Sequence, residues 1–170
     1  IAAGSLAFDA IPEMGTFLRT RIPDVRRILA PRLVVTTLAV VAAFVVGALT
    51  AWYETWALIG SPGAGSVLAG IGFGALFLVF VVALVAAVAG RASSVLGTVM
   101  ASIVVLLVMP IFGISDAIGR WLPTHLGGAL GALPAGATEP SDYWRASLMT
   151  VVLVALLLWL AASLAERREL

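Results

Sequence analysis

Hydrophobic residues in this chain gather into long uncharged runs that are separated by short polar breaks. Residues 66–114 hold two such runs, and the break between them carries a single cation, Arg91. Residues 64–90 contain no charge, and about 27 helical residues reach about 40 Å, enough to cross a bilayer with some tilt. Residues 95–114 are also uncharged. The pattern predicts a transmembrane helical hairpin that turns at Arg91.

Two further apolar runs flank this hairpin. Residues 33–53 precede it and end in a group of aromatic side chains that is typical of a membrane–water interface, Trp52, Tyr53 and Trp56. Residues 146–165 follow it and are again uncharged. We therefore predict an all-α integral membrane protein, a helical bundle whose transmembrane domain covers residues 33–170. Its predicted spans are residues 33–53, 66–90, 95–114 and 146–165.

The segment between the third and fourth predicted spans is too polar and broken to cross a bilayer, yet too apolar for an ordinary external loop. Residues 115–134 are rich in glycine and still hold large apolar side chains such as Trp121, Leu126 and Leu130. So many apolar side chains need an interface to cover them. We predict two short helices that dip into the outer leaflet and return; a disordered external loop is the alternative.

Residues 9–32 form the one charge-rich stretch before the spans. Apolar residues recur there every three or four positions, which lines one face of a helix. Pro12 suits a first turn, Pro23 is expected to break the helix and Pro31 to end it. This predicted amphipathic helix is either a passive interfacial anchor or a cytoplasmic docking element that passes force from a partner into the first span.

The first residues of the chain, 1–8, are apolar but too short to span, and no basic region precedes them. They do not resemble a signal peptide. We expect them to be the end of a preceding span in a longer protein, with a frayed tail as the alternative.

Composition agrees with a membrane protein. Hydrophobic residues make up 62% of the chain and charged residues 11%, and the mean hydropathy is +1.13. Soluble domains average about 45–50% apolar and about 25% charged residues. The chain has no Cys and no Lys, which excludes a disulfide framework, a cysteine metal site and a lysine-containing phosphate-binding loop.

The arginines predict the orientation. Placing residues 9–32, the turn at Arg91 and the C-terminus inside leaves only Arg120 and Arg145 outside, as the positive-inside rule requires. The arginines inside are Arg19, Arg21, Arg26, Arg27, Arg32, Arg91, Arg167 and Arg168. We expect a multi-pass protein of a plasma membrane, the inner membrane in bacteria, with a cytoplasmic C-terminus.

Chemistry inside the membrane is poorly supported by the sequence. No predicted span contains an ionisable residue, and such residues mark proton relays and hydrolytic sites at depth. Ser102 and Ser147 lack an acid–base partner, and His125 lies in the predicted outer segment. No filter-like run or ring of charge indicates a channel. We predict no catalytic residue, metal site, cofactor or nucleic-acid partner, and hence not an enzyme.

Small residues indicate where helices approach closely. Gly70 and Gly74 lie on one face of the second predicted span at a four-residue spacing, a pattern that favours tight helix packing. The same spacing also occurs in spans with no special packing partner.

Taken together, these stretches resemble a known family. The order of a truncated span, then Glu13, Gly15 and Thr16, then the basic stretch with Arg26 and Arg27 before a span, is similar to the second half of ABC-2 type exporter permeases. That family also has short re-entrant helices before its last span. The chain departs from it in having Pro31-Arg32 where the family has glycine and a basic residue, and in lacking its first two spans.

The resemblance implies a permease subunit without ATPase activity of its own. It would export a hydrophobic, amphipathic or polysaccharide substrate, powered by a separate ATP-binding cassette subunit and paired with a second permease copy or a homologous permease within membrane lipid. Residues 9–32 would then be the cytoplasmic coupling region, and the ATPase would dock on Glu13, Gly15, Thr16, Arg19, Arg21, Arg26 and Arg27. The alternative is a structural or anchoring membrane subunit that transports nothing.

Overall fold

The computed structural model describes residues 26–60, 63–91 and 94–167, and in these residues all regular secondary structure is helical. Four of the helices are long and apolar enough to cross a membrane. The helical fold is as predicted, and the four long apolar helices agree with the prediction of a membrane protein. The helices in chain order are α3 (Arg26–Leu58), α4 (Ala64–Ala89), α5 (Val95–Phe112), α6 (Asp116–Gly119), α7 (Pro123–Gly127), α8 (Ala129–Ala132), the 3-10 helix η2 (Pro140–Tyr143) and α9 (Trp144–Arg167).

Helix α3 differs from the expectation at its start. It runs without interruption for 33 residues from Arg26, with Pro31 inside it, so the predicted end of a helix at Pro31 is wrong. Pro31 lies in the second turn, where its missing N–H costs one hydrogen bond close to the helix end and leaves the turns that follow intact. The rest of the predicted amphipathic helix, and residues 1–8, lie outside the described residues.

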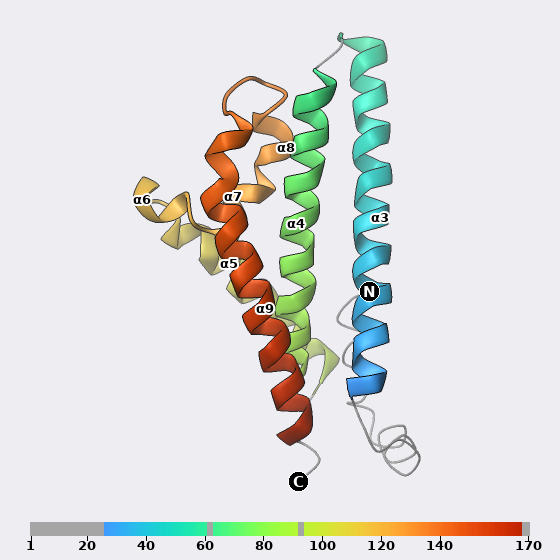
Figure 1. The fold of residues 1–170 in the computed structure, drawn as a ribbon, viewed down its shortest axis with the longest axis vertical. Helices are drawn as coiled ribbons and strands as arrows, with labels where there is room; N and C mark the ends of the chain where they lie inside the picture. Colours follow the sequence, from blue (N-terminus) through green and yellow to red (C-terminus); the bar gives the residue numbers. More distant parts are fainter. Residues whose placement is uncertain (1–25, 61–62, 92–93, 168–170) are drawn as a thin grey trace.

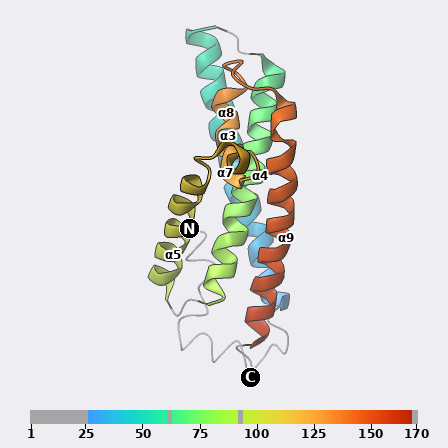
Figure 2. The same cartoon turned by 90° about the vertical axis from the view of Figure 1, so that its left-hand side faces the viewer.

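Helix α4 is the centre of the fold. It packs against α3, α5, α7, α8 and α9 (Figures 1 and 2). Half of its most apolar stretch is buried within the protein, compared with 6% of the corresponding stretch of α3 and 11% of that of α5. Its buried positions include both predicted packing glycines, Gly70 and Gly74. A helix that is buried on several sides needs apolar residues all round, which explains its uninterrupted apolar sequence.

The long helices alternate in direction. The start of α3, the end of α4, the start of α5 and the end of α9 all lie at one end of the molecule, which we call the arginine end because Arg32 and Arg91 are there (Figure 1). The other end carries the end of α3 and the start of α4. We call it the aromatic end, after Trp52, Tyr53 and Trp56 near the end of α3.

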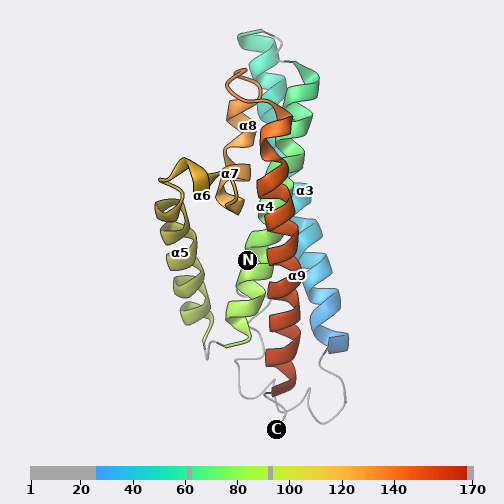
Figure 3. The same cartoon turned by 60° about the vertical axis from the view of Figure 1, so that its left-hand side comes forward.

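Residues 115–134 fold into three short helices, where the sequence predicted two, and the 3-10 helix η2 follows them before α9. Figure 3 shows that α6 lies just beyond the C-terminal end of α5. From there α7 and α8 run beside α4 toward the aromatic end. Leu126 and Ala129 in α7 and α8 are fully buried. The segment is therefore packed against the bundle.

Two separate hydrophobic clusters hold the bundle together along α4. The cluster toward the arginine end joins α3, α4 and α9 through small residues, with Val82, Ala86 and Ala161 among its buried members. The cluster toward the aromatic end joins α4 to the short helices and the start of α9. Its buried members are Leu126, Ala129, Leu133, Tyr143 and Ala146. Helix α5 belongs to neither cluster, and its only buried residues are Thr98 and Ser102.

Candidate functional site

Of the docking residues that the resemblance implies, the structure describes only Arg26 and Arg27. Glu13, Gly15, Thr16, Arg19 and Arg21 lie outside the described residues. The backbones of Arg26 and Arg27 form the first turn of α3. The helix continues from that turn past Pro31 into its long apolar part.

The short helix α8 packs closely against α4 at Gly70. A Cβ atom at Gly70 would lie 2.9 Å from the Cα of Leu130 and 3.1 Å from the backbone oxygen of Ala129. Both of these are backbone atoms, so a side chain at Gly70 would push α8 away from α4. About two turns further along α4, the ring of Phe77 lies 3.6 Å from the position that a Cβ of Gly127 would occupy. The short helices thus contact α4 from Gly70 to Phe77.

Gly74 contacts a ring of a different helix, α3. A Cβ there would lie 2.6 Å from the tip of the Phe44 ring of α3. The two glycines predicted as packing positions therefore contact different neighbours, α8 and α3, and both contacts lie within this chain. A further small residue, Gly90, faces Leu164 of α9, whose Cβ would be 3.3 Å away from a Cβ at Gly90.

Three stacked rings tie α7 and η2 to α4. The Tyr143 ring lies between those of Phe73 and His125, with centroid separations of 4.9 Å and 4.7 Å. Its hydroxyl forms a 3.0 Å hydrogen bond with that of Thr138 in the loop before η2. Because Tyr143 is almost fully buried, this bond satisfies a polar group that would otherwise be costly. His125 is thus part of a packed aromatic stack.

A second aromatic group fixes the start of α9. The Arg145 guanidinium carbon lies 5.6 Å from the centre of the Trp121 ring and 5.4 Å from that of Trp144. The two indoles meet edge to face at 6.2 Å. Such contacts are worth about 0.5–1 kcal/mol each at exposed sites. They hold the connection between α6 and α7 against the first turn of α9.

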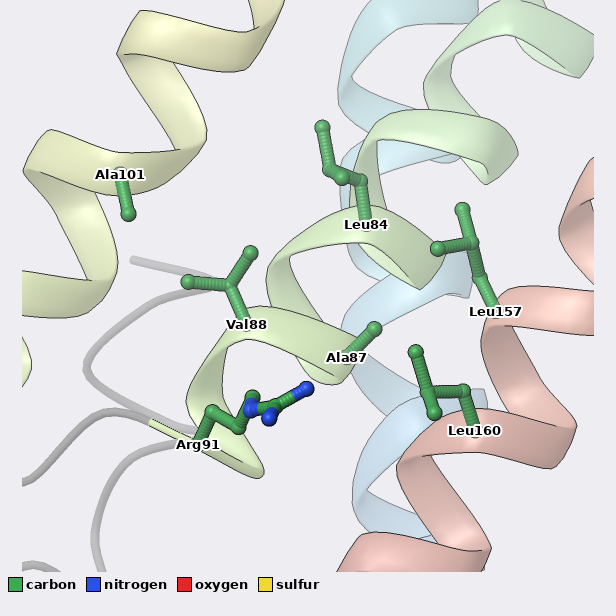
Figure 4. A pocket seen from close by; sticks show the side chains of 7 residues that line it. All are labelled: Leu84, Ala87, Val88, Arg91, Ala101, Leu157 and Leu160. Atoms are coloured by element: carbon green, nitrogen blue, oxygen red, sulfur yellow. The ribbon is translucent and has the colours of Figure 1, made fainter.

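An apolar groove opens near the arginine end. It has a volume of about 450 Å³ and lies between α4, α5 and α9. Leu84, Ala87 and Val88 of α4 form its floor, Ala101 of α5 forms one wall, and Leu157 and Leu160 of α9 form the other (Figure 4). Among the described residues that line it, Arg91 at the end of α4 is the charged one, and its side chain points toward α9 (Figure 4).

Within residues 26–60, 63–91 and 94–167, no group of three His, Asp or Glu side chains is placed to hold a metal ion. The Ser102 and Ser147 hydroxyls are buried, and no described group forms a hydrogen bond with them. Neither the groove nor the contact between Phe44 and Gly74 was predicted from the sequence, because each is formed by helices that are far apart along the chain.

Comparison with known proteins gives no relative: no family model, no curated protein and no solved structure matches the chain.

Proposed function

We propose that this chain is a membrane-spanning subunit of an ATP-driven exporter of the ABC-2 type. It would move a hydrophobic, amphipathic or polysaccharide substrate, and a separate ATPase subunit would supply the energy. The observation that carries the proposal is the placement of α7 and α8, which lie between the third and fourth apolar helices of the chain and reach the middle of α4.

The depth of α7 supports a re-entrant arrangement. Phe77, which contacts Gly127 of α7, precedes Arg91 by about 14 positions, or about 21 Å along a helix. If Arg91 marks one boundary of a hydrocarbon core of about 30 Å, α7 lies roughly 9 Å inside the other boundary. A backbone at that depth must be covered by protein and bonded internally. The packing of α7 on α4 and α9, the burial of Pro123 and Leu126, and the bonds from His125 N–H to Leu122 and from Gly128 N–H to His125 support this arrangement.

The continuity of α3 supports a coupling role for its first turn. An element that receives force from an ATPase must be joined stiffly to a span, and Arg26 and Arg27 begin the same helix that continues for 33 residues to Leu58. A passive anchor would need no such continuity. In this proposal the arginine end faces the cytoplasm, in agreement with the positive-inside rule, and the aromatic end faces outward.

Co-purification tests the proposal. We expect the full-length chain, purified from its native membranes in mild detergent, to retain a soluble ATPase subunit and to hydrolyse ATP. Reversing charge in Arg26→Glu/Arg27→Glu should release that subunit, or uncouple hydrolysis from transport, while membrane insertion is unchanged. Arg120→Glu, at an exposed position near α6, is the matched control and should behave as the parent.

Two outcomes would contradict the proposal. Purification of the intact chain without any ATPase would indicate a structural or anchoring subunit. A double variant that assembles and transports as well as the parent would show that the coupling surface is not the first turn of α3.

A further inference from the structure

We propose that the groove at the arginine end binds one anionic phospholipid, with an acyl chain between α5 and α9 and the phosphate on Arg91. This inference does not depend on the chain being an exporter subunit. It rests on the shape and lining of the groove and on the position of its one charge.

The lining of the groove selects an apolar occupant. Leu84, Ala87, Val88, Ala101, Leu157 and Leu160 supply only hydrocarbon surface. Water in such a space would lack the two to four polar partners that ordered water needs. The volume of about 450 Å³ falls within the range of about 300–1,000 Å³ that is usual for ligand sites. An acyl chain is apolar and fits this volume.

The charge of Arg91 selects the head group. The guanidinium lies at the end of the groove, where α4 ends, and none of the described side chains that line the groove is acidic. From Leu84 to Arg91 the groove floor follows about two turns of α4, about 10 Å, so a chain lying on the floor would bring its phosphate to the guanidinium. Basic sites between transmembrane helices bind anionic head groups in this way, since arginine matches the geometry of a phosphate.

The weak attachment of α5 allows a lipid to enter. Helix α5 contributes only Thr98 and Ser102 to the buried interior, so the wall that holds Ala101 is not fixed by a hydrophobic cluster. A chain in the groove would fill the space between α5 and α9 and would bring each of them additional apolar contact.

Native mass spectrometry of the purified chain in detergent, titrated with phosphatidylglycerol or phosphatidylcholine, tests the inference. We expect one tightly retained phosphatidylglycerol and about fivefold weaker retention of phosphatidylcholine, which corresponds to about 1 kcal/mol for one arginine near a head group. Arg91→Gln should abolish the preference and Arg91→Lys should retain most of it. Arg120→Gln, which removes a charge outside the groove, should match the parent.

A second pair of variants tests the acyl chain. Ala101→Phe places a ring in the groove wall and should weaken binding of both lipids, whereas Val104→Phe, an exposed position on the same helix outside the groove, should not. Unchanged far-UV circular dichroism would show that each variant is folded. Equal retention of the two lipids by the parent, or a full preference in Arg91→Gln, would overturn the head-group assignment. Parent-like binding by Ala101→Phe would overturn the placement of the chain in the groove.

Discussion

A single methyl group added at Gly70 tests the packing of the short helices. In Gly70→Ala the new Cβ would meet the Leu130 Cα at 2.9 Å and the Ala129 backbone oxygen at 3.1 Å. Real Cβ contacts are almost never this short, and backbone atoms cannot rotate away. Either α8 moves outward or α4 bends.

The control is Gly72→Ala, two positions along the same helix, where a Cβ would meet nothing within 4 Å. Both substitutions gain the same helix propensity, about 1 kcal/mol, so the difference between the two variants isolates the contact. Overpacking of this kind costs about 1–3 kcal/mol. We therefore expect Gly70→Ala to be about 1–3 kcal/mol less stable than Gly72→Ala, and Gly72→Ala to be as stable as the parent or more so.

Gly74→Ala should have a stability between those of Gly70→Ala and Gly72→Ala. Its Cβ would lie 2.6 Å from the Phe44 ring, a shorter contact than at Gly70, but with the tip of a side chain that can turn. We expect a smaller loss than for Gly70→Ala in spite of the shorter distance. Unfolding in mixed micelles with increasing SDS, followed by far-UV circular dichroism, measures all three variants. If Gly70→Ala were as stable as Gly72→Ala, α8 would not rest on Gly70 and the re-entrant arrangement would lose its main support.

The remaining predictions concern other parts of the bundle. Tyr143→Phe should lower the free energy of unfolding by about 0.5–1.5 kcal/mol through loss of the hydrogen bond to Thr138. A double-mutant cycle with Thr138→Ala should show that the two changes are not additive. Additive losses would refute the bond. Ser94→Ala should lower the free energy of unfolding by about 0.5–2 kcal/mol, because the Ser94 hydroxyl caps α5 by accepting a hydrogen bond from the Gly97 N–H at 3.1 Å. Ser94→Asp should restore most of that loss. An unchanged unfolding midpoint in Ser94→Ala would refute the cap. Since the chain has no cysteine, Ile59→Cys should react with an impermeant thiol reagent from outside intact cells and Ser94→Cys only after permeabilisation; equal labelling from outside would contradict the proposed orientation.

The four long helices could be predicted because the absence of charge over about 20 residues is a property of the local sequence. The predicted ends differ from the observed ones, since α3 includes residues on both sides of the run at 33–53 and α9 begins at Trp144. Pro31 was misjudged because the cost of a proline depends on how close it lies to a helix start. This distance depends on the residue at which α3 begins, and the sequence around Pro31 does not determine that residue.

The candidate sites depend on tertiary packing, which explains why the sequence analysis did not find them. Leu84, Ala101 and Leu157 line one groove although they come from three different helices, and none of them is unusual for a membrane helix. Gly70 was recognised as a packing residue, but its partner, Ala129, lies about 60 positions away and carries no signal of its own. All of the docking residues, from Glu13 to Arg27, remain predictions.

The short length of α5 has a consequence for the surrounding bilayer. Its 18 residues extend about 27 Å, whereas the 29-residue apolar part of α3, Ala30–Leu58, on the other side of α4 extends about 44 Å (Figure 3). Lipids that contact α5 must therefore match a thinner hydrophobic surface than lipids that contact the opposite side of the bundle, at a cost of fractions of a kcal/mol per Å of mismatch. The protein would thin the bilayer on one side only, so its stability should depend on acyl-chain length.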